Sequence, residues 1–142
     1  MRIVDLNLLL YAINADSAHH AAARVWWERA LNDDEPIGLP WLVLLGFLRI
    51  ATNARIFPHP LAADAAIEKV DAWLGRDNVR IAREKEDHWD VLRSLIADSG
   101  TAGNLTTDAH LAALAISHDA TLVSSDTDFG RFKGLRWQNP LA

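Results

Sequence analysis

The chain contains no cysteine among its 142 residues. Disulfide bonds, zinc sites built on thiolates and cysteine nucleophiles are therefore excluded. Glycine (7 residues) and proline (5 residues) are scarce, and half of the residues are hydrophobic. This composition excludes disordered, collagen-like and disulfide-stapled chains, and a chain of this length is expected to fold as one domain over residues 1–142.

Long apolar runs and an excess of positive charge are also missing. The apolar run from Leu39 to Phe47 is far shorter than the ~20 residues that cross a bilayer, and the first residues do not read as a secretory signal. We therefore expect a cytoplasmic protein with no membrane partner. Fourteen Lys and Arg against nineteen Asp and Glu give a net charge of −5, so any contact with nucleic acid must be local.

Short apolar runs alternate with helical patterns along the chain. Strands are expected at Arg2–Val4, Ile37–Leu39, Val79–Ile81, Thr121–Val123 and, more weakly, Leu135–Trp137. Helices are expected at about 8–12, 17–31, 41–52, 61–74, 87–97 and 107–118. In the second helix Ser17 is the expected N-cap, and Ala22, Val25 and Trp26 form the expected apolar stripe. The alternation predicts an α/β fold with a mainly parallel sheet.

Two of the expected strands run into aspartate. Val4 is followed directly by Asp5, and Val123 is followed by two serines and Asp126. Ligands of parallel α/β sheets bind at the carboxyl ends of the strands. The carboxylates of Asp5 and Asp126 are therefore expected to meet at one edge of the sheet.

Two further acidic residues belong to the same regions of sequence. Asp108 stands at the start of an expected helix, where it also suits the positive end of the helix dipole as an ordinary cap residue. Asp126 and Asp128 form a DxDxG pattern, which is typical of loops as well as of metal sites. An EF-hand is disfavoured, because the position that should carry its final acidic ligand is Trp137.

The combination of these residues favours a metal site more than any one of them does. Carboxylates gathered at one edge repel each other, and a hard divalent cation such as Mg²⁺ or Mn²⁺ relieves that repulsion. Such a site activates water and neutralises charge on a phosphodiester. An aspartyl phosphatase is less favoured because position 7 is Asn7, and a dinucleotide fold is disfavoured because no glycine-rich turn follows the first strand.

The segments MRIVDLNLLLYA, LLGFLRIATNARIF, TDAHLAALAISHDATLVSSDTDFGRF and GLRWQNP resemble the PIN-domain toxins of VapBC toxin–antitoxin systems. The likeness runs over nearly the whole chain. It implies a three-layer α/β/α sandwich with a mainly parallel sheet. It also implies a Mg²⁺- or Mn²⁺-dependent endoribonuclease of structured RNA that is neutralised by a VapB-type antitoxin and is usually a homodimer.

The resemblance assigns roles to individual residues. Asp5, Asp108 and Asp126 fall on the first, third and fourth acidic positions of the family and are the expected metal ligands. Asp128 falls on an acid common beside the fourth, and it joins these three as a candidate catalytic residue. Supporting polar positions of the family are matched by Asn7 and Ser124.

Position 46 departs from the family pattern, in which a Glu precedes the sequence FLR. Gly46 stands there instead, although glycine inside a helix costs roughly 1 kcal/mol relative to alanine. We interpret it as a lost carboxylate, which predicts an impaired nuclease. The alternative is a catalytically inactive toxin scaffold that still binds antitoxin and RNA.

Several other residues have both a functional and an ordinary interpretation. Arg49 shares a helix face with Gly46 and could reach the site or a phosphate, or simply pair with a carboxylate. Arg131, Lys133 and Arg136 form a basic cluster that suits RNA phosphates or is solvated surface. The apolar helix at 41–52 and the Trp26–Trp27 pair suit a dimer mate or an antitoxin helix, or an ordinary core.

Overall fold

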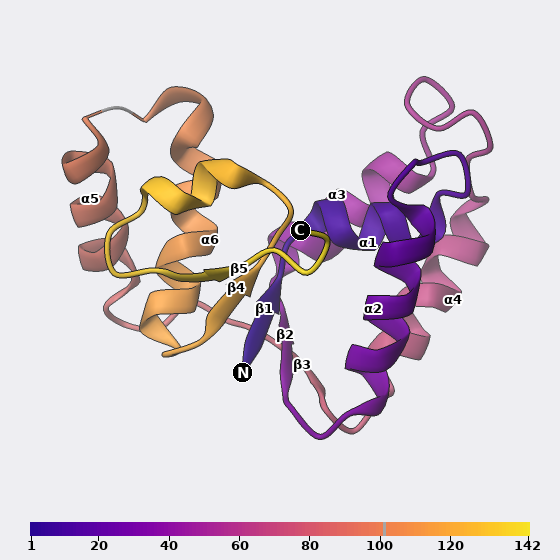
Figure 1. Cartoon of the computed structure of the whole chain (residues 1–142), viewed down its shortest axis with the longest axis horizontal. Coiled ribbons are helices and arrows are strands. Elements are labelled where there is room, and N and C mark those ends of the chain that lie inside the picture. The colour runs from indigo at the N-terminus through magenta and orange to yellow at the C-terminus, as the bar shows by residue number, and fades with distance from the viewer. Residues whose placement is uncertain (101) are drawn as a thin grey trace.

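In the computed structural model, which describes residues 1–100 and 102–142, five parallel strands form one sheet (Figure 1). Their order across the sheet is β3-β2-β1-β4-β5. The strands are β1 (Arg2–Val4), β2 (Ile37–Leu39), β3 (Val79–Ile81), β4 (Thr121–Val123) and β5 (Arg136–Gln138). The four stronger expected strands are thus confirmed residue for residue, and the last one lies one residue further along.

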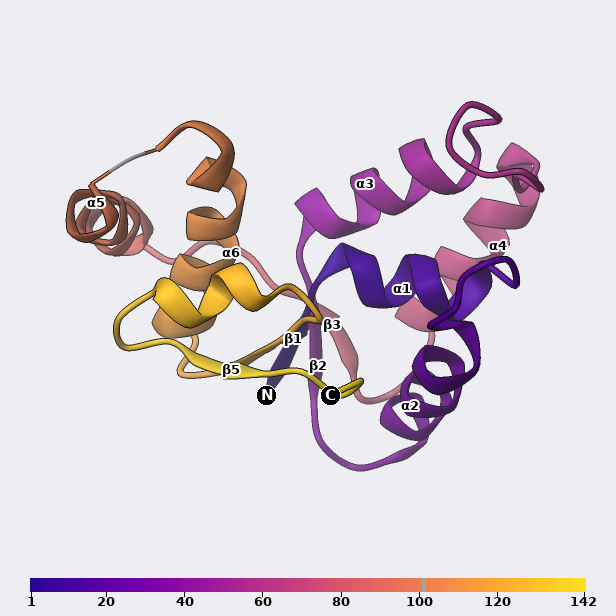
Figure 2. The same cartoon turned by 45° about the horizontal axis from the view of Figure 1, so that its top comes forward.

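Helices cover both faces of this sheet (Figures 1 and 2). One face carries α1 (Leu6–Ile13), α2 (His20–Asn32), α3 (Trp41–Ala51) and α4 (Ala63–Leu74). The other carries α5 (His88–Ser99) and α6 (Thr106–Ser117), with short 3₁₀ helices η1 (Gly103–Leu105) and η2 (Thr127–Arg131). The strands β1, β2 and β3 follow one another toward one edge of the sheet, and the chain then returns to place β4 and β5 on the other side of β1. Because each crossover is right-handed, this reversal of direction puts the two groups of helices on opposite faces. The three-layer α/β/α fold class is confirmed.

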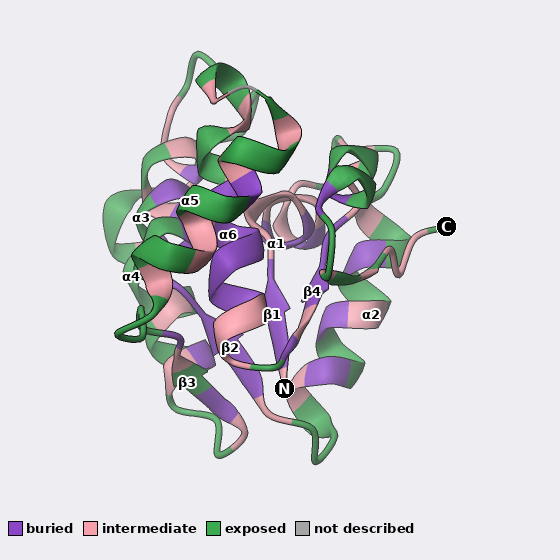
Figure 3. Cartoon of the chain, turned by 90° about the vertical axis from the view of Figure 1, so that its left-hand side faces the viewer, coloured by how far each residue is buried: buried purple, intermediate pink, exposed green. Residues whose placement is uncertain are grey.

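The central strands and α6 form the middle of the core (Figure 3). Ile3, Val4, Leu122 and Val123 are 0–1% exposed, because β1 and β4 have a helical layer on each side. Strands of this kind are apolar on both faces, which is why the short runs RIV and TLV were readable as strands. The core therefore fixes the ends of β1 and β4 relative to each other.

Helix α2 differs from its prediction in start and in orientation. Ser17 does not cap it: the Ser17 hydroxyl accepts from the backbone N–H of His19 (3.1 Å), and the helix begins at His20. The buried face comprises Ala23, Trp27 and Ala30. Trp27 is in the core because its ring packs edge-on against Trp73 of α4 (centroids 5.7 Å apart). The expected stripe is therefore wrong, and of the two interpretations left open for the Trp26–Trp27 pair the ordinary core applies to Trp27.

Helix α3 is apolar on both its inner and its outer side. Val43, Leu44 and Phe47 are buried in the core. The exposed residues on the outer side of its first two turns, which we call the α3 ridge, are Trp41 (48% exposed), Leu42 (40%) and Leu45 (60%). The helix thus combines a core face with an uncovered apolar one. Within residues 1–100 and 102–142, no helix has the length and apolar character needed to cross a membrane.

Candidate active site

The candidate site lies where β1 and β4 end side by side. Strand β1 has β2 on one side and β4 on the other, so the chain reverses its direction of sheet growth at this pair. Such switch points are where ligands bind in parallel α/β sheets. Figure 2 shows α1 leaving β1 on one side of this point and the segment toward η2 leaving β4 on the other. The backbone N–H of Asp5 donates to the carbonyl of Val123 (2.9 Å), which ties the two strand ends together.

Ser124 connects the two strand ends through its side chain. It is fully buried, and its hydroxyl donates to Oδ2 of Asp5 (2.7 Å). Oγ of Ser124 also accepts from the backbone N–H of Asp126 (3.0 Å) and from Nδ2 of Asn7 (3.3 Å). A hydroxyl has one donor and two acceptor positions, so its bonding capacity is used completely. The structure thus places Asn7 and Ser124 beside the acids, as expected from the sequence.

Asp5 is both the N-cap of α1 and a member of the site. Its Oδ1 accepts from the backbone N–H of Leu6 (2.7 Å), while Oδ2 accepts from Ser124. Burial raises the pKa of Asp5, and the charge of Asp126 raises it further, whereas the hydrogen bonds from Ser124 and Leu6 oppose the rise. Both oxygens are therefore held in place by bonds that favour the ionised form.

Asp108 reaches the site from the first turn of α6. Partial burial raises its pKa from 3.8 to about 6, with further contributions from the negative charges of Asp126, Asp5 and Asp128. The guanidinium of Arg131 acts in the opposite direction. A divalent cation bound among these acids would favour the ionised form of Asp108, because it would offset the negative charges that raise the pKa of this residue.

Asp126 and Asp128 are arranged by the turn that follows β4. Asp126 caps η2, and its Oδ1 accepts from the backbone N–H of Asp128 (2.9 Å). Phe129 in the same turn is buried and anchors it to the core. The more exposed Asp128 pairs with Arg131 at 3.4 Å.

Three carboxylates of the site suit a single divalent cation. One oxygen each from Asp108, Asp126 and Asp128 lies within 4.8 Å of the others. Opposite oxygen ligands of Mg²⁺ are about 4.2 Å apart, so this spacing is close to what one ion requires. Oδ1 of Asn7, whose Nδ2 donates to Ser124, is buried without a partner in the described part of the chain. Asp5 stands outside this trio and is joined to Asp126 through Ser124.

Leu6 occupies the space beside Gly46, which the sequence did not reveal. Gly46 is buried in α3, and a Cβ atom there would lie 2.6 Å from Cδ2 of Leu6. No local pattern could signal this contact, because the two residues are forty positions apart. The glycine therefore makes room for Leu6. Arg49, one turn further along α3, is exposed.

The expected basic cluster is divided by the fold. Arg131 contacts the acid cluster through Asp128, whereas Arg136 pairs with Asp119 (2.9 Å), which precedes β4. Arg136 is the first residue of β5, whereas the site lies at the carboxyl ends of the parallel strands, so Arg136 is at the opposite end of the strands from the site. Lys133 lines a separate hollow with Asp87, Asp90 and Asp98. Only Arg131 of the three is in contact with the candidate site.

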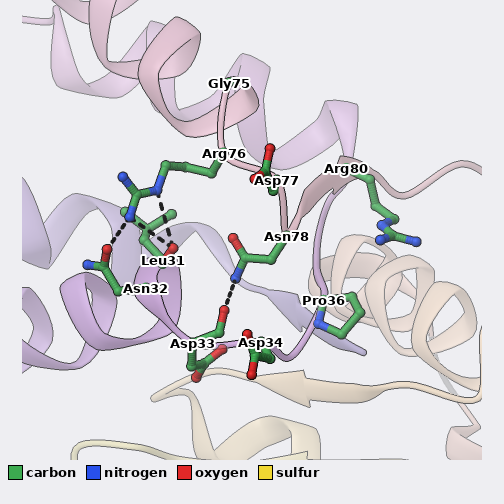
Figure 4. A pocket seen from close by; sticks show the side chains of 10 residues that line it. All are labelled: Leu31, Asn32, Asp33, Asp34, Pro36, Gly75, Arg76, Asp77, Asn78 and Arg80. Atoms are coloured by element: carbon green, nitrogen blue, oxygen red, sulfur yellow. Dashed lines mark hydrogen bonds between the residues drawn. The ribbon is translucent and has the colours of Figure 1, made fainter.

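A hollow of about 510 Å³ lies between the loop that joins α2 to β2 and the loop that joins α4 to β3 (Figure 4). Two of its polar side chains, Asn78 and Arg76, hold the loops together. Nδ2 of Asn78 donates to the carbonyls of Ala30, Asp33 and Glu35, and Arg76 donates to the carbonyl of Leu31. We interpret this hollow as a structural junction between α2 and β3.

Comparisons with known proteins agree with this geometry. Residues 2–135 match the model of the PIN domain family. Ribonuclease VapC37 of Mycobacterium tuberculosis is 45% identical over 142 residues, covering 100% of this chain and 99% of that protein. VapC ribonuclease Mb2897 of Mycobacterium bovis is 46% identical over 141 residues, covering 99% and 96%.

Solved structures share the same fold at low sequence identity. VapBC2 from Rickettsia felis, bound to a DNA fragment from its promoter, gives a TM-score of 0.70 at 20% identity, with 97% of both chains covered. Mycobacterium tuberculosis VapC20, a toxin that cleaves the sarcin–ricin loop, gives 0.67 at 18% identity, with 96% and 99% covered. The acidic site lies at the switch point, the PIN model matches residues 2–135, and relatives matched over their full length are named VapC ribonucleases, so this chain belongs to the PIN-domain family, among its VapC-type ribonucleases.

Proposed function

We propose that this chain is a metal-dependent endoribonuclease, the toxin of a VapBC system, and that its acid cluster hydrolyses RNA phosphodiester bonds. The observation that carries the proposal is the trio of carboxylates from α6 and the β4–η2 turn, set at the end of the strand that leads to Asp5. Full-length relatives named VapC ribonucleases supply the reaction class. Mg²⁺ or Mn²⁺ is the proposed ion, since every candidate ligand is an oxygen.

The proposed division of roles follows from the contacts. Asp108, Asp126 and Asp128 would hold the cation, and Asp5 would join them as ligand or as acceptor of a proton from water. A bound divalent cation supplies a Lewis acid that activates water and neutralises charge developing on the phosphodiester. Ser124 and Asn7 keep Asp5 in position. Arg131, next to Asp128, is the proposed contact for an RNA phosphate.

The partners follow from the same assignment. A VapB-type antitoxin is the expected protein partner, because the structural relatives include VapBC complexes. RNA is the substrate, and a structured RNA is the proposed form. We also propose that the chain forms a homodimer, and the α3 ridge is the surface that supports this proposal.

The direct test is cleavage of a labelled RNA hairpin with and without Mg²⁺ or Mn²⁺. We expect cleavage that requires the cation and that falls by at least about 100-fold in Asp126→Asn. The matched control is Asp71→Asn, an exposed carboxylate on α4 outside the cluster. Cation-dependent hydrolysis of a small phosphate monoester, without any RNA cleavage, would instead favour a phosphatase.

A second candidate function is a toxin scaffold that binds antitoxin and RNA but does not cut. Gly46 favours it, because the side of the site next to α3 carries a leucine methyl group and a glycine instead of a carboxylate. Absence of cleavage by the parent chain, combined with RNA binding and antitoxin binding, would establish this alternative. We propose impaired rather than absent activity, because the other four acids are in place.

A further inference from the structure

Trp137 on the edge strand β5 contacts the turn that carries two of the site's carboxylates. Its indole Nε1 donates to the carbonyl of Ser124 (3.0 Å). The backbone N–H of Ser124 donates in turn to the carbonyl of Gln138 (3.0 Å). The peptide groups on both sides of Ser124 are therefore fixed by β5, one through the backbone and one through the Trp137 side chain.

The ring of Trp137 also contacts the far end of the same turn. A Cβ atom at Gly130 would lie 3.4 Å from Cζ3 of Trp137, so the indole lies against the backbone of that glycine. One side chain thus contacts both Ser124 and Gly130. Asp126 and Asp128 lie between Ser124 and Gly130 in the sequence. Any movement of this turn would therefore disturb its contacts with the indole of Trp137.

Backbone pairing alone gives this turn limited support. Strand β5 is three residues long and is the outermost strand, paired only with β4 among the strands of the sheet. Ser124 is fully buried, so its carbonyl would lose its donor, and gain no water, if the indole N–H were removed. The peptide would then reorient, and the Ser124 hydroxyl with it.

We propose that Trp137 is a positioning residue of the metal site. Through the Ser124 peptide it sets the hydroxyl that holds Asp5 and the backbone of Asp126, and through Gly130 it keeps Asp128 in register with Asp126. It touches neither the cation nor the RNA. The inference rests on the proposed function for its catalytic consequence but not for its effect on cation binding.

The test is the affinity for Mn²⁺ of the full chain, measured by electron paramagnetic resonance or calorimetry. Trp137→Phe keeps an aromatic ring and removes the N–H. Loss of a group that orients metal ligands typically lowers the affinity for the metal by about 10–100-fold, so we expect the Kd for Mn²⁺ to rise by about tenfold. The matched control is Trp27→Phe, which removes a buried indole N–H that has no partner among the described residues. This control should leave the Mn²⁺ affinity unchanged.

Coupling to Ser124 separates positioning from general destabilisation. In a Ser124→Ala background, Trp137→Phe should weaken Mn²⁺ no further, because the hydroxyl it positions is gone. In RNA cleavage, Trp137→Phe should lower kcat and leave KM unchanged. If Trp137→Phe does not fold, Gly130→Val keeps the indole N–H but adds methyl groups against the ring, and it should weaken Mn²⁺ binding in the same direction.

Two outcomes would overturn the inference: an unchanged Kd for Mn²⁺ in a folded Trp137→Phe chain, or an effect of undiminished size in the Ser124→Ala background. Failure of the proposed function looks different. In that case the parent chain binds Mn²⁺, Trp137→Phe weakens this binding, and neither protein cleaves RNA.

Discussion

Residues of one chemical type behave differently in this molecule according to where the fold places them. Asp5 is held by two hydrogen bonds that favour its charged form, yet its pKa is raised by burial. Asp108 lacks such bonds in the described contacts and faces three other carboxylates, so its pKa rises to about 6. The carboxylates of the site therefore repel one another, and a bound cation would relieve this repulsion.

This repulsion makes the stability of the metal-free chain depend on pH. Because the folded-state pKa of Asp108 lies above its ordinary value, the folded chain binds more protons than the unfolded chain between pH 3.8 and about 6. The free energy of unfolding from this group therefore falls as the pH rises through that window. Asp108→Asn should raise the metal-free Tm at pH 7 and flatten its change between pH 4 and 6. Thermal unfolding followed by circular dichroism measures both, with Asp71→Asn as the control; a lower Tm for Asp108→Asn at pH 7 would contradict the argument.

The Gly46–Leu6 contact predicts coupled substitutions. Gly46→Ala gains up to about 1 kcal/mol of helix propensity, but the new methyl group requires the half-buried Leu6 side chain to rotate away, so the net gain should be smaller than this. Leu6→Ala makes room, and Gly46→Ala should then be more stabilising in that background. Urea unfolding of the four proteins gives the coupling energy. Additive effects would show that Leu6 does not fill the space at position 46.

The lost-acid hypothesis is tested at the same position. Gly46→Glu in the Leu6→Ala background has space for the new side chain and should raise Mg²⁺-dependent RNA cleavage by orders of magnitude, if position 46 is the missing acid. Asp5→Asn added to this protein should remove the gain. A double variant that folds and binds Mn²⁺ but cuts RNA no faster than the parent would refute the hypothesis.

Helices contribute to the site through their ends and to assembly through their faces. The N-terminus of α1 is capped by Asp5, and the first turn of α6 carries Asp108, so two helix dipoles favour negative charge at the site. Helix α3 supplies no carboxylate, but its outer side leaves the α3 ridge uncovered. Exposed apolar side chains grouped on one helix are typical of a protein interface.

The ridge predicts how self-association can be disrupted. Leu45→Glu places a charge on the most exposed member of the ridge, so it should shift a dimer to monomer without a large change in Tm. Light scattering at several protein concentrations measures the shift. Val25→Glu on α2, which is also about half exposed, is the control and should leave the assembly unchanged. A parent chain that is monomeric at high micromolar concentration would remove the homodimer proposal.

Across the whole molecule, the sheet brings together residues from the two ends of the chain. The acids stand at positions 5, 108, 126 and 128, and only the order β1-β4 makes them neighbours. The unfolded chain therefore has no metal site, and any cation that binds must stabilise the fold. The net charge of −5 adds a general attraction for cations and a general repulsion of RNA, so the proposed RNA contact has to come from a few groups such as Arg131.

This linkage predicts the response to metal. Mn²⁺ at about 100 times its Kd should add about 2.7 kcal/mol to the free energy of unfolding, a rise in Tm of roughly 5–10 °C. The rise should be smaller at pH 5 than at pH 7, because Asp108 is then protonated and a cation must displace its proton. Differential scanning calorimetry at both pH values provides the measurement, and a chelator should reverse the effect. An equal rise in Asp126→Asn would place the ion elsewhere.

The strands, the fold class and the end of the sheet where the acids lie could all be predicted from local sequence patterns. Apolar runs such as RIV and TLV are local signals, and parallel strands necessarily present their carboxyl ends to one side, so Asp5 and Asp126 could be brought together without coordinates. Asp108 and Asp128 were found by the same reasoning with the family resemblance. All four acids lie in one region of the structure, and their catalytic role stays a prediction.

The tertiary structure alone decided which side chains contact each other. A helix turns by about 100° per residue, so an error of one position in the phase of α2 exchanged Trp26 for the buried Trp27. The fit of Leu6 into the space at Gly46, the pairing of Arg136 with Asp119 and the bond from Trp137 to Ser124 all join residues from different elements. Such contacts depend on the packing of side chains from distant segments, for which no local pattern exists.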